Sequence, residues 1–274
     1  MAPREPLVDT TLPRMPSSFV ERLDAVIERW ASILPLHLRP ELRDDFQAFG
    51  IEHDRTIGTI ESIWQRRERR YAFDESTGLA RRRPFHDHLA AVLATPESPV
   101  LRAVGVLFID VNNLKKVNDT FGHAAGDKAV AVVGTIIREA IRVEQNTDFM
   151  TRTTAGEDDY SASRHGGDEF LIALELKDPS GIDIIAPRIK QHVDDPARQR
   201  ARGFTTPVDL TIAMGGVVYD LGASPPPVPA ATLATSLITA ADEQMYYSKR
   251  DGHIHIAEAR YTDKLEVGHA HAIG

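Results

Sequence analysis

The 274-residue chain contains no cysteine. This excludes disulfide bonds, thiolate metal sites and cysteine nucleophiles, and it is typical of proteins in a reducing cytoplasm. No stretch approaches the roughly 20 consecutive apolar residues that a membrane-spanning helix needs. The Pro-rich start of the chain also lacks the apolar core of a signal peptide. We therefore expect a cytoplasmic protein without a membrane span.

Long basic runs are also missing. The formal net charge is −8, and no cluster of lysines and arginines could follow a nucleic-acid backbone. We expect no DNA or RNA partner, whereas a nucleotide substrate stays open. The composition, 42% hydrophobic and 26% charged, is that of a globular protein, and the length allows one full domain and a smaller module.

The first quarter of the chain has a helical pattern. Residues 1–16 are short, polar and Pro-rich, which predicts disorder. Residues 17–73 contain apolar residues at helical spacing, and Ile57, Ile60, Trp64 and Tyr71 form a short heptad seam. Two interpretations stay open: a helix packed on its own domain, or a parallel dimer helix that leads into the next domain.

From residue 74 onward, helical and strand-like segments alternate. The apolar patterns predict helices over 85–93, 127–143, 182–193 and 230–250, and strands over 104–110, 169–175 and 208–219. Gly215 and Gly216 indicate a bulge or bend in the last of these strands, and residues 256–274 show no clear pattern. Helices packed on a mixed sheet, an α+β or α/β sandwich, are the expected architecture.

Acidic residues mark the ends of two predicted strands. Asp110 ends an apolar strand, and Asp168 and Glu169 follow Gly166-Gly167 at the start of another. Three oxygen ligands from two strands suit Mg²⁺ and the two-metal chemistry of nucleotidyl transfer. The glycines allow a phosphate to approach the backbone. The alternative is an ordinary hairpin turn, because Gly-Gly-Asp is good turn chemistry.

A polar segment follows Asp110. Lys115 could pair with a phosphate, and Asn118 with Asp127 offers an amide and a carboxylate that can read the edge of guanine. The alternative is that Asn118 and Asp119 only end a helix, and that Asp127 caps the next one.

Four motifs in order resemble the GGDEF diguanylate cyclase family. The segment Arg164–Phe170 resembles the signature itself, and Asp74–Phe85 resembles the opening D-x-L-T-G-L-x-N-R-R-x-F. The segment Leu107–Asp127 resembles the family's strand and loop, and Ala240–Lys249 its closing A-D-x-A-L-Y-x-A-K. The resemblance spans residues 74–256, a very specific signal for the fold.

The resemblance implies a cyclase-palm, ferredoxin-like α+β domain over residues 74–256, between the helical region 17–73 and a tail at 257–274. It implies a diguanylate cyclase that condenses two GTP into cyclic di-GMP and two pyrophosphates across a homodimer. Mg²⁺ or Mn²⁺ is the implied cofactor, with two ions per site. The helical region is the place for a signal or a protein partner.

The resemblance also implies a role for each matching residue. Asp110, the carbonyl of Val111, Asp168 and Glu169 would hold the metal. Asp168 is the candidate base for the ribose 3′-hydroxyl, and Glu169 would support the metal site. The substrate would be bound by Lys115, Asn118, Asp127, Gly166, Gly167 and Lys249, with guanine read by Asn118 and Asp127.

Several positions depart from the family pattern. Ser76 replaces Leu, Arg81 replaces Asn, Leu114 replaces Phe, Asn112-Asn113 replaces Asp-His, and His253-Ile254 replaces Arg-Asn. None of these removes an implied metal ligand or guanine reader, although His253 could weaken a phosphate contact. Two alternatives to the synthesis of cyclic di-GMP stay open. The domain could be catalytically silent and bind GTP or cyclic di-GMP, or it could accept adenine as well as guanine nucleotides.

The family's inhibitory product site is not matched. Its R-x-x-D motif, five residues before the first signature glycine, falls on Glu157 and Tyr160. This part of the chain, residues 144–163, is longer than in the family and acidic, which predicts a mobile loop. We therefore expect no high-affinity product inhibition at that site.

Overall fold

The computed structural model describes residues 71–94, 100–145, 147–150, 159–221, 228–261 and 264–273. The predictions for residues 1–70, including the dimer seam at Trp64, lie outside the described residues. So does most of the long loop before the signature, residues 151–158.

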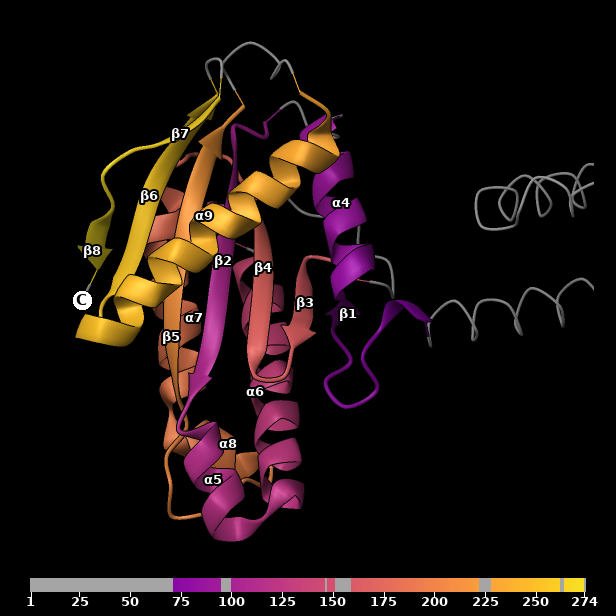
Figure 1. Ribbon diagram of the computed structural model, residues 1–274, viewed down its shortest axis with the longest axis vertical. Coiled ribbons are helices and arrows are strands. Elements are labelled where there is room, and N and C mark those ends of the chain that lie inside the picture. Colours follow the sequence, from indigo (N-terminus) through magenta and orange to yellow (C-terminus); the bar gives the residue numbers. More distant parts are fainter. Residues whose placement is uncertain are drawn as a thin grey trace, which may run out of the picture. The chain divides into compact units, whose positions relative to one another are not determined.

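The described residues form one mixed sheet flanked by helices, and this confirms the predicted α+β fold (Figure 1). The strand order is β1-β3-β4-β2-β5-β6-β7, and β8 pairs with β6. The pairs β1–β3 and β5–β6 are parallel, and the others are antiparallel. The strands are β1 Ala80–Arg81, β2 Ala103–Asn112, β3 Ala162–Gly166, β4 Glu169–Leu176, β5 Thr211–Asp220, β6 Ile254–Tyr261, β7 Leu265–Val267 and β8 His271–Ile273.

Helices cover both faces of this sheet. The side chains of the central strand β2 pack alternately into two hydrophobic cores, one on each face. Leu107 and Ile109 pack toward α6 and α7, whereas Val106 and Phe108 pack toward α4 and α9. An uninterrupted apolar run is therefore what this position requires. The helices are α4 Arg82–Ala94, α5 Leu114–Phe121, α6 His123–Glu144, α7 Gly181–Asp194, α8 Pro196–Ala201 and α9 Ala230–Asp251.

The predicted bulge at Gly215 and Gly216 is wrong. Strands β2 and β5 stay in register without interruption from Ala103↔Asp220 to Asn112↔Thr211. The reason for the glycine is the close approach of α9: a Cβ on Gly215 would lie 1.9 Å from the backbone nitrogen of Met245. Position 215 therefore accepts only glycine, because the backbone of α9 occupies the space that a side chain would need.

The sequence pattern missed the short and edge elements. Strand β6 runs through residue 256 to Tyr261, and β7 and β8 pair with it in the part of the chain for which no pattern was evident. Strand β5 starts at Thr211 rather than at residue 208, since the backbone of Leu210 pairs with the buried side chain of Gln199. Within the described ranges, no helix has the length and apolarity to cross a bilayer.

Candidate active site

Two of the predicted acidic residues face each other on neighbouring strands. Asp110 lies near the end of β2 and pairs in register with Glu169, the first residue of β4. Residues opposite each other in an antiparallel pair project to the same face of the sheet. The two carboxylates therefore share the face that α9 covers, and Asp110 is only 8% exposed.

Gly167 and Asp168 form the turn of the β3–β4 hairpin, and Gly166 is the last residue of β3. The backbone carbonyl of Asp168 accepts a hydrogen bond from the N–H of Val111 at 3.1 Å, so the turn is tied to the end of β2. Gly167 has a left-handed φ of 52°, and the space where a Cβ would stand is open at both Gly166 and Gly167. The predicted hairpin turn and an open approach to its backbone are thus both present.

One ammonium group lies against these acids. The Nζ of Lys249, in the last turn of α9, is 2.8 Å from Oδ2 of Asp110. Burial raises the pKa of the Asp110 carboxyl, Lys249 opposes this rise, and Asp168 and Asp242 add to it. Burial also raises the pKa of Glu169, as do the neighbouring Asp110, Asp242 and Asp168. Negative charge here exceeds what one ammonium neutralises, so the site favours a further cation.

The residues fit Mg²⁺ in one way and not in another. Within the described ranges, no group of three or more His, Cys, Asp or Glu side chains is arranged to hold a metal ion. A closed cage of Asp110, Asp168 and Glu169 is therefore not assembled. Mg²⁺, however, is usually held by one or two carboxylates, with water and substrate phosphates as the other ligands. The facing pair Asp110 and Glu169 suits that mode of binding.

Arg164 fixes the hairpin turn to the start of the domain. Its Nε and Nη2 donate to the carbonyl oxygen of Gly167 at 3.0 and 2.8 Å, and its Nη1 donates to Ser76 Oγ at 3.1 Å and to Asp74 Oδ2 at 3.4 Å. Burial would raise the pKa of Asp74, but hydrogen bonds from Ser76 and Thr77 and the charge of Arg164 lower it overall. Asp74 therefore stays ionised and holds Arg164 in place.

The predicted guanine readers lie together at the same end of the sheet. Helix α5 begins just after the end of β2, and α5 and α6 meet beyond the ends of β2 and of the β3–β4 hairpin (Figure 1). Asn118 packs on Gly126, where a Cβ would lie 1.8 Å from its Oδ1, and Asp127 is the next residue. The capping alternative for Asp127 is wrong, because α6 begins at His123 with Gly122 as its N-cap. Lys115 lies in the exposed first turn of α5.

Sequence reasoning assigned no structural role to three residues that matter here. Asp74, Arg164 and Asp242 lie inside the motifs quoted above. Their interactions with the site, however, are visible only in the structure. The Oγ of Ser248 also accepts a hydrogen bond from the N–H of Met214 at 3.1 Å. This bond anchors the end of α9 beside Lys249.

Comparisons with known proteins agree with this geometry. The family described as "Diguanylate cyclase, GGDEF domain" matches residues 71–255. Diguanylate cyclase A of Treponema denticola is 28% identical over 166 residues, 61% of this chain and 37% of that protein. The cyclic di-GMP phosphodiesterase PdeR of Escherichia coli is 28% identical over 179 residues, 65% of this chain and 22% of that protein. The chain thus spans well under half the length of these two relatives.

A solved structure has the same fold. The coiled coil and GGDEF domain of DgcB from Caulobacter crescentus, in complex with c-di-GMP, aligns with a TM-score of 0.53 and 21% identity. The alignment covers 78% of this chain and 95% of that one. The family match extends over more than half of the chain, and the signature residues occupy the hairpin beside Asp110. The chain therefore belongs to the GGDEF diguanylate cyclase domain family.

Proposed function

We propose that the chain is an active diguanylate cyclase that condenses two GTP into cyclic di-GMP and two pyrophosphates. The observation that carries this proposal is the facing pair Asp110 and Glu169, with Lys249 2.8 Å from Asp110. Asp110 is buried and Glu169 is half-buried, and a carboxylate pair in such a place whose charge is incompletely neutralised is costly unless a cation binds it. A metal cation bound together with the triphosphate of GTP would offset that cost.

The residues take the following roles in the proposed reaction. Asp168 accepts the proton of the ribose 3′-hydroxyl, whose oxygen attacks the α-phosphorus while pyrophosphate leaves. Asp110, Glu169 and the Val111 carbonyl would hold Mg²⁺ or Mn²⁺, which would neutralise charge on the phosphates when bound. Lys249 and Lys115 bind phosphate oxygens. The open space above Gly166 and Gly167 lets the nucleotide lie on the hairpin.

Guanine selection is assigned to the α5–α6 corner. Asn118 and Asp127 offer an amide and a carboxylate to the Watson–Crick edge, and the carboxylate accepts from the N2 amine that adenine lacks. Each domain binds one GTP under this proposal, so two copies must face each other to close both phosphodiester bonds. A homodimer is therefore part of the proposed function.

The test is incubation of the purified chain with GTP and Mg²⁺, followed by chromatography of the products. Cyclic di-GMP and pyrophosphate should appear in a ratio of one to two, and chelation of the metal should stop the reaction. Asp110→Asn is the matched variant, since it keeps the shape of the side chain and removes the charge. It should retain the fold but lose turnover.

The second candidate is a silent domain that binds GTP or cyclic di-GMP as a regulatory module. A match to part of a phosphodiesterase favours it, since such a domain occurs there beside another activity. It is distinguished by calorimetry run beside the turnover assay. Nucleotide binding without product from the wild-type chain would reject the cyclase and retain the silent module.

A further inference from the structure

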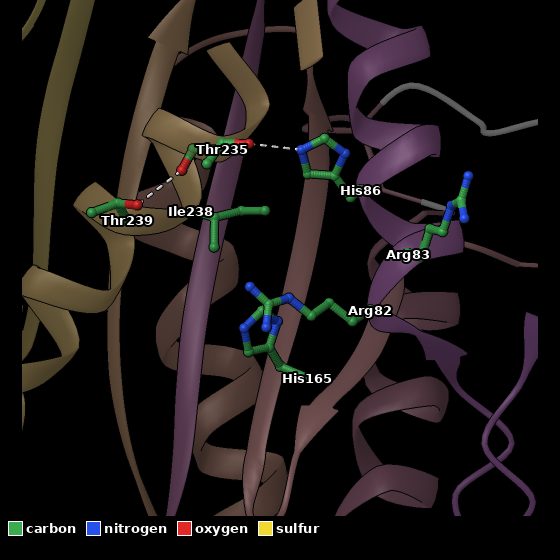
Figure 2. A pocket seen from close by; sticks show the side chains of 7 residues that line it. All are labelled: Arg82, Arg83, His86, His165, Thr235, Ile238 and Thr239. Carbon is green, nitrogen blue, oxygen red and sulfur yellow. Dashed lines mark hydrogen bonds between the residues drawn. The ribbon is translucent and has the colours of Figure 1, made fainter. Parts of the chain in front are cut away.

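A cavity lies between α4 and α9 on the face of the sheet that these helices cover, next to the end of β3 (Figure 2). Its volume is about 330 Å³, within the range of sites for small molecules. No acidic residue lines it. The polar side chains that line it are Arg82, Arg83 and His86 from α4, His165 from β3, and Thr235 and Thr239 from α9.

Part of this lining is already satisfied. The Thr235 hydroxyl donates to the carbonyl of Ala231 at 3.0 Å, so it must accept from Nε2 of His86, 2.9 Å away. The Thr239 hydroxyl donates to the carbonyl of Thr235 at 3.0 Å. These bonds join α4 to α9 and fix the wall of the cavity. The side chain of Arg83 is 92% exposed and lies at the rim, where its Nε is 3.8 Å from Oδ2 of the exposed Asp87.

The other two polar groups differ from these. Nδ1 of His165 is buried without a hydrogen bond. Arg82 is exposed, and within the described ranges no hydrogen bond or ion pair joins its guanidinium to another residue. Burial lowers the pKa of His165, Arg82 lowers it further, and Asp242 on α9 opposes both. The ring of Phe108 on β2 meets the imidazole edge-on at 5.5 Å. An exposed guanidinium thus lies near a half-buried imidazole whose Nδ1 has no hydrogen-bond partner.

We propose that this cavity binds a phosphate group, with Arg82 and Nδ1 of His165 as its main ligands and Arg83 closing the rim. A guanidinium presents a fork of N–H donors that matches the oxygens of phosphate, and a neutral imidazole protonated at Nδ1 adds one more donor. The phosphate could be free or part of a nucleotide, because the recognising chemistry is the same. The site is separate from the carboxylates that would hold the catalytic metal.

The proposed phosphate site is next to the catalytic hairpin in the sequence. His165 immediately precedes Gly166, and Arg164 on its other side holds the hairpin turn. A ligand that orders His165 therefore acts next to the signature without touching the reacting atoms.

The experiment is NMR of the full chain labelled with ¹⁵N-histidine, titrated with inorganic phosphate and separately with GMP, without GTP or Mg²⁺. Saturable shifts of the His165 ring resonances are expected, together with a higher pKa of that ring, because a bound anion favours the imidazolium. Tighter binding of GMP than of phosphate would assign the group to a nucleotide, and equal binding would assign it to free phosphate.

Variants decide where the anion binds. Arg82→Gln should weaken phosphate binding at least tenfold, whereas Arg260→Gln on β6, an exposed arginine far along the chain, should leave it unchanged. His165→Gln, followed by calorimetry, gives a second measurement if the Arg82 variant folds poorly. Unchanged affinity in both cavity variants would overturn the proposal. So would binding that disappears in Lys249→Met but persists in Arg82→Gln.

Discussion

The face of the sheet that α9 covers has an acidic side, at Asp110 and Glu169, and a basic side, at Arg82 and His165, and the two differ in the charge that they leave unbalanced. On the acidic side Asp110 and Glu169 face each other, and among the described residues the ammonium paired with Asp110 is that of Lys249. On the other side Arg82 and His165 line a cavity that has no acidic wall. Only three residues of chain separate His165 from Glu169, yet the acidic side suits a cation and the basic side suits an anion. Under the two proposals made above, each imbalance is offset when an ion binds, a metal cation on the acidic side and a phosphate on the basic side.

The largest effect is expected from the acidic side. Asp168→Ala or Glu169→Ala should lower the rate of cyclic di-GMP formation by about 10²–10⁴-fold, since proton transfer and metal binding are both lost. The far-ultraviolet circular dichroism spectrum should stay unchanged. Robust product from either variant would mean that the roles are assigned to the wrong residues.

Arg164 tests the connection between the two sides. Arg164→Gln removes both bonds to the Gly167 carbonyl and should lower kcat about 10²-fold through misplacement of the turn, with a smaller change in KM. Arg164→Lys should not restore activity, because one ammonium cannot bridge Gly167, Ser76 and Asp74. Full rescue by lysine would show that charge alone is needed there.

Asp127 tests the guanine reader. Loss of its carboxylate in Asp127→Ala should cost about 1–3 kcal/mol of binding, or roughly 5–150-fold in the KM for GTP. Asp119→Ala, an exposed neighbour on α5, is the matched control. If competition between GTP and ATP is unaltered in the Asp127 variant, guanine is read elsewhere.

Acid should weaken the acidic side selectively. The raised pKa values of Asp110 and Glu169 mean that both carboxyls take up protons at a higher pH than ordinary acids, so kcat/KM should fall on the acid side of neutrality as they do. Lys249→Met removes the group that opposes the rise at Asp110, so the acid limb should move to higher pH. The same substitution at the neighbouring Arg250 should leave the limb in place.

The smallest effect is expected from added product. Tyr160 stands where the family's inhibitory aspartate would be, and its ring stacks on Phe73 at 5.1 Å. Added cyclic di-GMP should therefore leave the initial rate nearly unchanged. Submicromolar, non-competitive inhibition would contradict this and would point to other arginines, such as Arg152 or Arg164. Loss of that inhibition in Arg82→Gln would instead assign it to the cavity.

The sequence by itself determined the fold class, the central strands and helices, and the identity of the residues at the hairpin. Strand β2 and helix α9 were predictable because their apolar patterns reflect burial against both neighbours. The turn chemistry of Gly166 to Asp168 is equally local. Strand β8 was missed because it has only three residues at an edge of the sheet, too few to show the alternation of apolar and polar residues that marks a strand.

Only the tertiary structure decided which residues meet. The register of β2 on β4 sets Asp110 against Glu169, and nothing in either segment alone specifies that pairing. The glycine at 215 suggested a bulge, but a helix backbone from 30 residues farther along the chain explains it. The basic cavity combines α4, β3 and α9, whose residues are far apart in sequence. Such long-range contacts follow from packing, which no local pattern encodes.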